Sequence, residues 1–367
     1  MSGAPTPVQA ARQAQLAHRW REPTVWLRLA ALGVCALVPL AVPSFQATDL
    51  AIKIVIFGAL VASYDVVIGY TGIVSFGHAM YFGFGAYAVA LAVGRLGSPT
   101  YGHLLTGFLV GIAVSALVAA LIGAFSLRVK AIFFAMITLA FAEFAGILAV
   151  QWSALTGGED GLSPRLPGVF AIAYDGGRLF GIPVTGKLVT YYTVLALCAA
   201  LFLVMARFVA SPLGRTLQAI RDNELRAEAL GVPTFALQIV SSTFASVVAA
   251  VVGGCYVMWV RYVNPESALG VPVMLDVLLM VIIGGIGTLW GSLIGAAVLL
   301  TARLLLPDLR GLAVLLGGSE FVQRLTARWL LVFGILFILV VFFFPKGVLG
   351  TAREALRRRR LSATPEV

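Results

Sequence analysis

Apolar segments long enough to cross a membrane recur along most of the chain, and they restrict the possible folds more than any other feature. A transmembrane helix needs about 20 consecutive, mostly apolar residues, and such segments occur from residue 27 to residue 344. Of the 367 residues, 60% are hydrophobic and 11% are charged, whereas about a quarter of the residues in soluble proteins are charged. As a soluble domain, this chain would have too few charged residues for a hydrated surface. The sequence therefore predicts an all-α polytopic membrane protein.

Ten spans can be delimited, some of them short or interrupted by glycine. The apolar block 273–306 is too long for one span, and Gly284, Gly285 and Gly287 interrupt it. We therefore divide this block into two short helices, and we note that the third span is rich in glycine. The predicted spans are 27–42, 50–68, 73–93, 104–125, 131–150, 188–209, 235–260, two within 273–306, and 329–344.

Basic residues predict how these spans are oriented. The net charge of +10 lies in the two tails and a few loops, a distribution typical of positive-inside topology rather than of nucleic-acid binding. Ten crossings place every basic segment on the cytoplasmic side, namely the two tails, Arg128 with Lys130, and the segment 211–232. Nine crossings would export the C-terminal arginine run 357–360. We therefore expect a bacterial inner-membrane protein with both termini in the cytoplasm. Its expected parts are a cytoplasmic tail (1–26), a transmembrane domain (27–350), a periplasmic loop (151–187), a cytoplasmic helix (211–232) and a basic cytoplasmic tail (351–367).

The segment 211–232, SPLGRTLQAIRDNELRAEALGV, is the longest polar, helix-compatible run between apolar spans. Ser211 is suited to the N-cap and Pro212 to the first turn, while Gly231 and the following Pro233 are suited to end the helix. One amphipathic helix outside the bilayer core is predicted, and an interfacial loop helix is its simplest interpretation. Its apolar residues recur at roughly helical spacing: Leu213, Leu217, Ile220, Ala227 and Leu230.

Two spans carry small residues at helical spacing. Small residues allow helix backbones to approach closely in a membrane, so close helix packing is the simpler interpretation. The functional alternative is that these helices line a path and slide or tilt against each other. The two series are Gly287, Gly291 and Gly295, and Ser75, Ala79, Gly83, Ala86 and Ala90.

Ionisable residues inside the spans are few. Such residues usually face the bundle interior or water and pair with another group. Structural hydrogen bonds are the simpler interpretation, because a proton relay would need several acids at one depth. The ionisable residues are Lys53, Asp65, His78, Glu143 and Asp276. The residues assigned to a translocation path or to helix packing are Ser75, Gly77, His78, Gly83, Glu143, Gly284, Gly285, Gly287 and Gly291.

Motifs for enzymatic chemistry are absent from the sequence. The stretch 181–187, GIPVTGK, matches a phosphate-binding loop until Leu188, where Ser or Thr should bind magnesium. The three histidines form no metal-binding pattern, and the three cysteines lie in apolar segments, which argues against a disulfide framework. We therefore expect a non-catalytic chain without a cofactor or metal.

Several stretches resemble one family of transport proteins. The segment 211–232 resembles the cytoplasmic coupling segment of ABC-importer permeases, whose Glu-Ala…Gly core corresponds here to Glu228, Ala229 and Gly231. More closely, the chain resembles the M-type permease of the high-affinity branched-chain amino acid importer family over most of residues 50–350. The stretches that carry this resemblance are GYTGIVSFGHAMYFGFGAY (69–87), ITLAFAEF (137–144), TGGEDGL (156–162), YVNPESALGVPVMLDVLLMVIIGGIGTLWGSLIGA (262–296) and FFFPKGVLG (342–350).

This resemblance implies a set of partners and a mechanism. The partners are a second related permease subunit, two cytoplasmic ATPase subunits and a periplasmic solute-binding protein. The coupling helix would dock on an ATPase subunit, spans six and seven would transmit its movement, and loop 151–187 would receive the binding protein. The implied coupling residues are Gly214, Arg215, Leu217, Ile220, Arg221, Glu224, Ala227, Glu228, Ala229 and Gly231, and the implied docking residues are Gly157, Gly158, Glu159 and Asp160.

Other functions remain open at this point. The carried solute would be a branched-chain or related hydrophobic amino acid, but related permeases serve urea, short amides or aromatic acids. An ion-coupled secondary transporter would need ionisable residues clustered at mid-depth. A passive channel would not need a large coupling helix.

Overall fold

The structure is a computed structural model that describes residues 33, 35–39, 44–95, 99–128, 131–172, 174–179 and 182–305, with isolated positions between 331 and 351. The chain divides into two compact units, residues 1–51 and 52–367. In the first unit, α3 (Phe45–Asp65) begins after Ser44, whose carbonyl accepts hydrogen bonds from the amide and hydroxyl of Thr48. The following description concerns the second unit. Both predicted tails, Lys130 and most of the first and tenth predicted spans lie outside the described residues.

Helices make up nearly all of the described part of the second unit. Among the described residues, six helices are long and apolar enough to cross a membrane, which confirms the predicted all-α polytopic class. The helices of 14 residues or more, which are not all long enough to cross a membrane, are α3 with its π-helical continuation η1 (Val66–Thr71), α4 (His78–Arg95), α5 (Tyr101–Ser126), α6 (Ala131–Gln151), α8 (Gly186–Ala210), α11 (Thr234–Val260), α13 (Val271–Gly284) and α14 (Leu289–Leu305). The short elements are α7 (Ser153–Thr156), η2 (Gly158–Asp160), η3 (Gly168–Phe170), β1 (Asp175–Leu179), β2 (Ile182–Thr185), α9 (Pro212–Asp222), α10 (Glu224–Ala229) and α12 (Pro265–Ala268).

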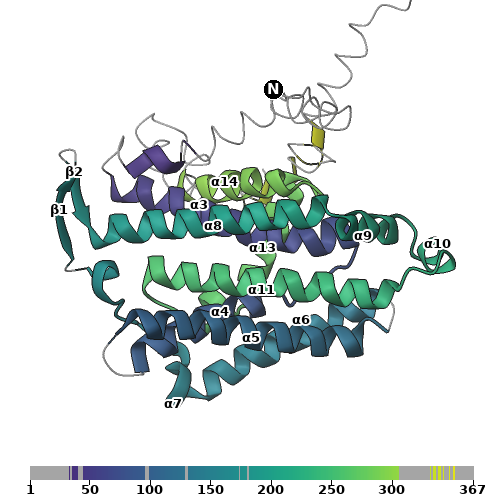
Figure 1. Cartoon of the computed structure of the whole chain (residues 1–367), viewed down its shortest axis with the longest axis horizontal. Helices are drawn as coiled ribbons and strands as arrows, with labels where there is room; N and C mark the ends of the chain where they lie inside the picture. The colour runs from purple at the N-terminus through teal and green to yellow at the C-terminus, as the bar shows by residue number, and fades with distance from the viewer. Residues whose placement is uncertain are drawn as a thin grey trace, which may run out of the picture. The chain divides into compact units, whose positions relative to one another are not determined.

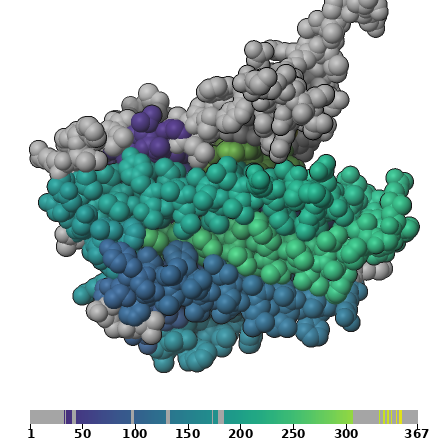
Figure 2. Space-filling model, in the orientation of Figure 1, coloured from purple at the N-terminus to yellow at the C-terminus, as the bar shows by residue number. Residues whose placement is uncertain are grey.

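Helices α4, α5 and α11 pack against one another and form the centre of the unit. Small residues make this possible, because a Cβ atom at Gly85 would overlap the backbone of Ala250, and one at Gly253 would overlap the carbonyl of Phe82. The helix α8 packs along α11 in the opposite direction, and the surfaces of the two helices run side by side (Figures 1 and 2). The antiparallel strands β1 and β2 lie at one end of these two helices, and α10 lies at the other (Figure 1).

The chain before α4 differs from the predicted third span. Residues 72–77 are not helical, because Gly72 adopts a left-handed conformation (φ 81°) that ends η1. Side chains satisfy part of this backbone: Thr138 Oγ1 accepts from the amide of Phe76 at 3.0 Å, and Ser75 Oγ accepts from the amide of Gly77 at 3.3 Å. The assignment of Ser75 to a helical small-residue face was therefore wrong. The remaining members of that face, Ala79, Gly83, Ala86 and Ala90, are buried on α4.

Helices α13 and α14 form a hairpin, which confirms that the block 273–306 contains two short helices. The turn holds Gly285 (φ 105°) and Gly287 (φ 80°), so Gly287 belongs to the turn and not to the helical GxxxGxxxG series that was predicted. A Cβ at Gly291 would overlap the carbonyl of Gly284, and one at Gly295 would overlap the carbonyl of Met280. This small-residue face therefore packs against α13 of the same chain.

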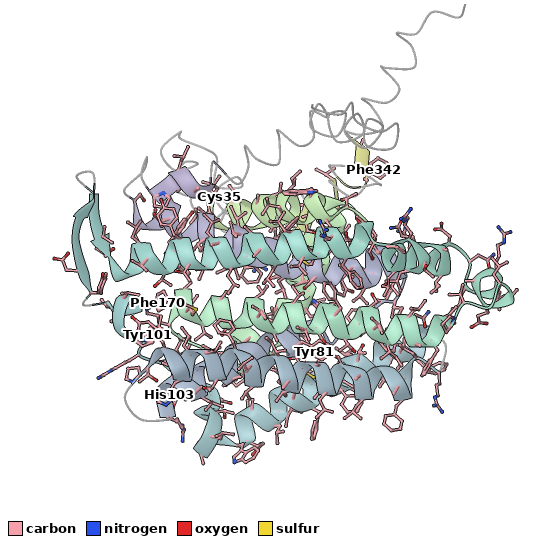
Figure 3. All side chains as sticks on the ribbon, viewed as in Figure 1. Cys35, Tyr81, Tyr101, His103, Phe170 and Phe342 are labelled. Atoms are coloured by element: carbon pink, nitrogen blue, oxygen red, sulfur yellow. The ribbon has the colours of Figure 1, made fainter. Side chains whose placement is uncertain are left out.

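Contacts within the unit assign its loops to two ends. The Arg128 guanidinium lies 5.6 Å from the ring centroid of Phe235 at the start of α11, so the α5–α6 connection lies at the α10 end. At the opposite end, Leu162 pairs with Val263 in an isolated β-bridge. Tyr101 and Phe170 also lie at that end (Figure 3), where the Tyr101 hydroxyl accepts a hydrogen bond from the amide of residue 169.

Candidate functional site

The segment 211–232 forms two helices and not the single helix that was predicted. It begins as expected, because Ser211 Oγ accepts a hydrogen bond from the amide of Gly214 at 3.2 Å and Pro212 occupies the first turn. Asn223 then adopts an extended conformation (φ −162°, ψ 99°) and ends α9. Its side chain accepts from the amide of Arg226 at 2.9 Å and caps α10. Asparagine is favoured at N-caps, and here this local preference breaks the helix.

The inner face of α9 and α10 packs on the chain itself. Leu217, Ile220 and Ala227 are 0%, 2% and 5% exposed, and they form a cluster with partly buried apolar neighbours. Gly214 is also buried, and a Cβ there would overlap the carbonyl of Val209. The resemblance implied that Leu217 and Ala227 are coupling residues on a helix that docks on a partner, but neither presents an apolar surface to a partner, because both are buried against this chain. The neighbours in the cluster are Phe208, Leu213, Val232 and Leu237.

Two acidic residues of α10 are bound to the start of α11. Glu224 Oε1 accepts a hydrogen bond from Gln238 Nε2, and Glu228 Oε1 accepts one from Thr234 Oγ1, both at 2.8 Å. Carboxylates are also favoured near the N-terminus of a helix by its dipole. The two bonds hold α10 against α11, so the two helices are expected to move together.

The outer face of α10 carries exposed apolar side chains. Leu225 and Leu230 are 79% and 78% exposed. Leu225 lies in α10 and Leu230 is its C-cap residue, so both follow the end of α9 that is distant from α8. Arg215 and Ala229 are also exposed. The apolar spacing does not reveal Leu225 and groups Leu230 with the buried residues, because a single helical register was assumed to continue through Asn223. The Asn residue between two charged side chains was the available signal for a break.

Most residues assigned to a path or to packing make packing contacts. His78 is 2% exposed, its Nε2 lies 2.8 Å from Ser63 Oγ, and its ring centroid lies 5.3 Å from that of Tyr64. A Cβ at Gly83 would overlap the side chain of Leu269, and Gly284 lies against Gly291. These contacts favour the packing interpretation for the α4 and α13–α14 residues.

Glu143 differs from these residues because it is exposed near the middle of α6. It lines a cavity of about 350 Å³ between α6 and the start of α12. Most of the neighbouring side chains are apolar, and Glu266 contributes a second carboxyl group from α12. A charged side chain is costly in the centre of a bilayer and usually faces protein or water. The other lining residues are Ala142, Gly146, Ile147, Val150, Gln151, Pro265, Leu269 and Gly270.

The four predicted docking residues lie together at the β1–β2 end of the unit. Gly157 and Gly158 have positive φ angles of 79° and 59°, and a Cβ at Gly157 would overlap the carbonyl of Gly161. The side chains of Glu159 and Asp160 are exposed on η2. The glycines are therefore required by the backbone, while the two acids form an outward-facing surface.

The loops at this end are bound to one another. The Tyr262 hydroxyl donates to the carbonyl of Asp160 at 3.0 Å, and Arg261 Nη2 donates to the carbonyl of Phe170 at 2.7 Å. Partial burial lowers the pKa of the Arg261 guanidinium from its ordinary value. These bonds fix the long loop after α6 to the end of α11.

A family model and two sequence relatives point to one family. A family model described as "Branched-chain amino acid transport system / permease component" matches residues 46–353. The chain is 26% identical over 359 residues to the high-affinity branched-chain amino acid transport system permease protein LivM of Escherichia coli (strain K12), which covers 93% of this chain and 78% of that protein. LivM of Salmonella typhimurium gives the same values. A solved structure of a metal-chelate type ABC transporter in an inward-facing conformation has 18% identity and a TM-score of 0.44, and the match covers 88% of this chain and 99% of that one.

Proposed function

The chain belongs to the family of branched-chain amino acid transport system permease components, and on this premise we propose that it is the membrane permease subunit of an ABC importer. It takes branched-chain or related hydrophobic amino acids from a periplasmic binding protein and releases them into the cytoplasm. A second related permease subunit completes the pathway, and two cytoplasmic ATPase subunits supply the energy. The chain itself is not catalytic in this proposal.

The observation that carries this proposal is the exposed tip formed by α10 at one end of the helices. The inner residues of α9 and α10 are buried, and the acids of α10 are bound to α11. Leu225 and Leu230 nevertheless remain almost fully exposed in an otherwise charged segment. Exposed apolar side chains with a polar rim are typical of protein interaction sites. We assign this surface to the ATPase subunit, with Arg215, Arg226 and Ala229 at its edge.

The opposite end supplies the surface for the binding protein. Glu159 and Asp160 are exposed on a loop that several hydrogen bonds hold in place. A fixed acidic surface suits a partner with complementary basic residues, which would be guided to it electrostatically. The placement of these two surfaces at opposite ends of α8 and α11 (Figure 1) supports their assignment to opposite sides of the membrane.

The exposed side of α6 is the proposed path for the solute. The Glu143 carboxylate has the charge needed to pair with the ammonium group of an amino acid, and the apolar side chains beside it suit an apolar solute. Urea and short amides are uncharged and would not need this carboxylate. A need for the Glu143 charge in transport would therefore distinguish amino acids from the uncharged solutes that related permeases carry.

Reconstitution of the full complex in proteoliposomes tests this function. We expect uptake and ATP hydrolysis that require the ATPase subunits and the loaded binding protein, and no hydrolysis by the purified chain alone. Leu225→Asp with Leu230→Asp should weaken ATPase binding without unfolding the chain, because both positions are exposed. The matched control is Leu225→Met with Leu230→Met, which keeps the surface apolar. Uptake driven by an ion gradient without ATP would refute the proposal.

A further inference from the structure

Three distant parts of the chain meet where the last turn of α9 contacts η1. Asp65 ends α3, Gly69 lies in η1, Arg221 lies in α9, and Gly287 lies in the turn between α13 and α14. Asp65 Oδ1 accepts a hydrogen bond from the amide of Gly287 at 2.7 Å, and Arg221 Nη1 donates one to the carbonyl of Gly69. We call these four residues the Asp65 junction.

Each bond in the Asp65 junction satisfies a backbone group at the end of a helix. The carbonyl of Gly69 lies in the last turn of η1, and the amide of Gly287 lies just before α14. Groups at these positions have no partner within their own helix. A guanidinium at a helix C-terminus and a carboxylate at a helix N-terminus are both favoured by the helix dipoles. We call the end of η1 and the turn between α13 and α14 the two helix breaks. Their backbone groups therefore depend on the side chains of Arg221 and Asp65.

Arg221 is exposed as a whole, but the stem and one guanidinium nitrogen of its side chain lie close to glycines at the Asp65 junction. Asp65 is fully buried, and a Cβ at Gly69 would overlap its carboxylate. A Cβ at Gly287 would lie 3.1 Å from Arg221 Nη1, and one at Gly72 would lie 3.0 Å from Arg221 Cγ. The Arg221 side chain thus lies over both breaks, and α9 cannot be displaced far without moving the breaks or losing these contacts.

Movement of α9 has two routes into the rest of the unit. The chain connects α9 directly to α8, and the α10 acids connect it to α11. The Asp65 junction adds α3 and the α13–α14 hairpin, which are far from α9 in sequence. We propose that Arg221 is the positioning residue through which a displacement of α9 reaches both helix breaks, and that Asp65 holds the breaks together so that they move as one. This inference rests on the proposed function, in which ATP-driven movement enters at α9.

The first test uses the complete chain without partners in lipid nanodiscs. Arg221→Gln removes the bond to Gly69, and Arg207→Gln, on an exposed residue at the end of α8, is the matched control. We expect Arg221→Gln to speed amide hydrogen exchange in residues 66–73 and 285–289 by about fivefold or more, the lower end of coupling between distant sites. The control should leave both segments unchanged. Equal exchange in Arg221→Gln and the native chain would overturn the inference.

The second test uses the full complex in proteoliposomes. Arg221→Gln should bind the ATPase subunits normally and hydrolyse ATP, but solute uptake per ATP should fall about fivefold or more. Arg221→Lys keeps a cationic donor and should restore part of that ratio. Weaker ATPase binding at an unchanged ratio would make Arg221 a docking residue and would overturn the inference. Loss of ATP dependence in the native complex would instead refute the proposed function. The nanodisc measurement needs no ATPase subunit, so it distinguishes failure of the inference from failure of the proposed function.

Discussion

Glycine serves different purposes in the α4–α11 contact and on the exposed side of α6. At the α4–α11 contact, Gly85 and Gly253 lie against backbone atoms of the opposing helix, where a Cβ has no room. Gly146 on α6 has no atom within 4 Å of the position that its Cβ would occupy. It lies one turn from the exposed Glu143 and lines the same cavity.

This difference separates a fixed part of the molecule from a free surface. Backbone-to-backbone contact between α4 and α11 leaves no space for sliding, so these helices are expected to behave as one body. The exposed side of α6 combines free volume with a carboxylate, which is costly to leave in lipid. Another molecule, either solute with water or a partner subunit, is expected to cover it.

The largest expected effect comes from adding a side chain at the α4–α11 contact. Gly253→Leu would force the side chain into the backbone of Phe82, and overpacking of a close contact costs about 1–3 kcal/mol or more. We expect loss of folded protein, measured by size-exclusion profile and thermal unfolding in detergent. Gly146→Leu is the control and should fold normally because its Cβ position is free. Equal folding of the two variants would show that the packing difference has no energetic consequence.

A smaller effect, confined to transport, is expected at Glu143. Glu143→Gln keeps the shape of the side chain and removes its charge, and charge-assisted hydrogen bonds contribute about 1.5–3 kcal/mol. We expect amino acid uptake by the full complex to fall about tenfold or more, with normal assembly and folding. The measurement is the initial uptake rate in proteoliposomes at matched complex levels. Undiminished amino acid uptake would remove Glu143 from the path and favour uncharged solutes.

The sequence was sufficient to predict the parts of the fold that depend on composition and helix length. The six membrane-length helices follow from apolar runs of about 20 residues, and the hairpin of α13 and α14 follows from Gly284, Gly285 and Gly287. The helical spacing of Leu217, Ile220 and Ala227 also identified one face of α9 and α10. Spacing could not show that this face is buried by the chain itself.

Features that depend on distant or competing contacts were not predictable. Arg221 contacts a carbonyl 152 residues away, and no local pattern indicates that its side chain reaches η1. The break at Asn223 arises because a side-chain cap competes with continuation of the helix. The non-helical segment 72–77 is supported by Thr138 of α6, a partner that hydropathy does not reveal.

The smallest expected effect concerns a glycine that is required by its conformation and not by packing. Gly231 has a φ of 81° with no atom within 4 Å of its Cβ position. Its amide donates to the carbonyl of Glu228 at 2.8 Å, and the amide of Val232 donates to that of Ala227 at 3.1 Å. These two bonds form a Schellman motif, which brings Val232 against the buried cluster that includes Leu217.

Gly231→Val should therefore strain the backbone by about 1–2 kcal/mol and loosen Val232 from that cluster. Gly231→Asn is the matched control, because asparagine tolerates the left-handed conformation. Since the position is exposed, both variants should fold and insert, and we expect Gly231→Val alone to lower uptake per ATP in the full complex. Equal coupling in the two variants would mean that the direction of the chain from α10 into α11 is held by the Glu224 and Glu228 hydrogen bonds without help from Gly231.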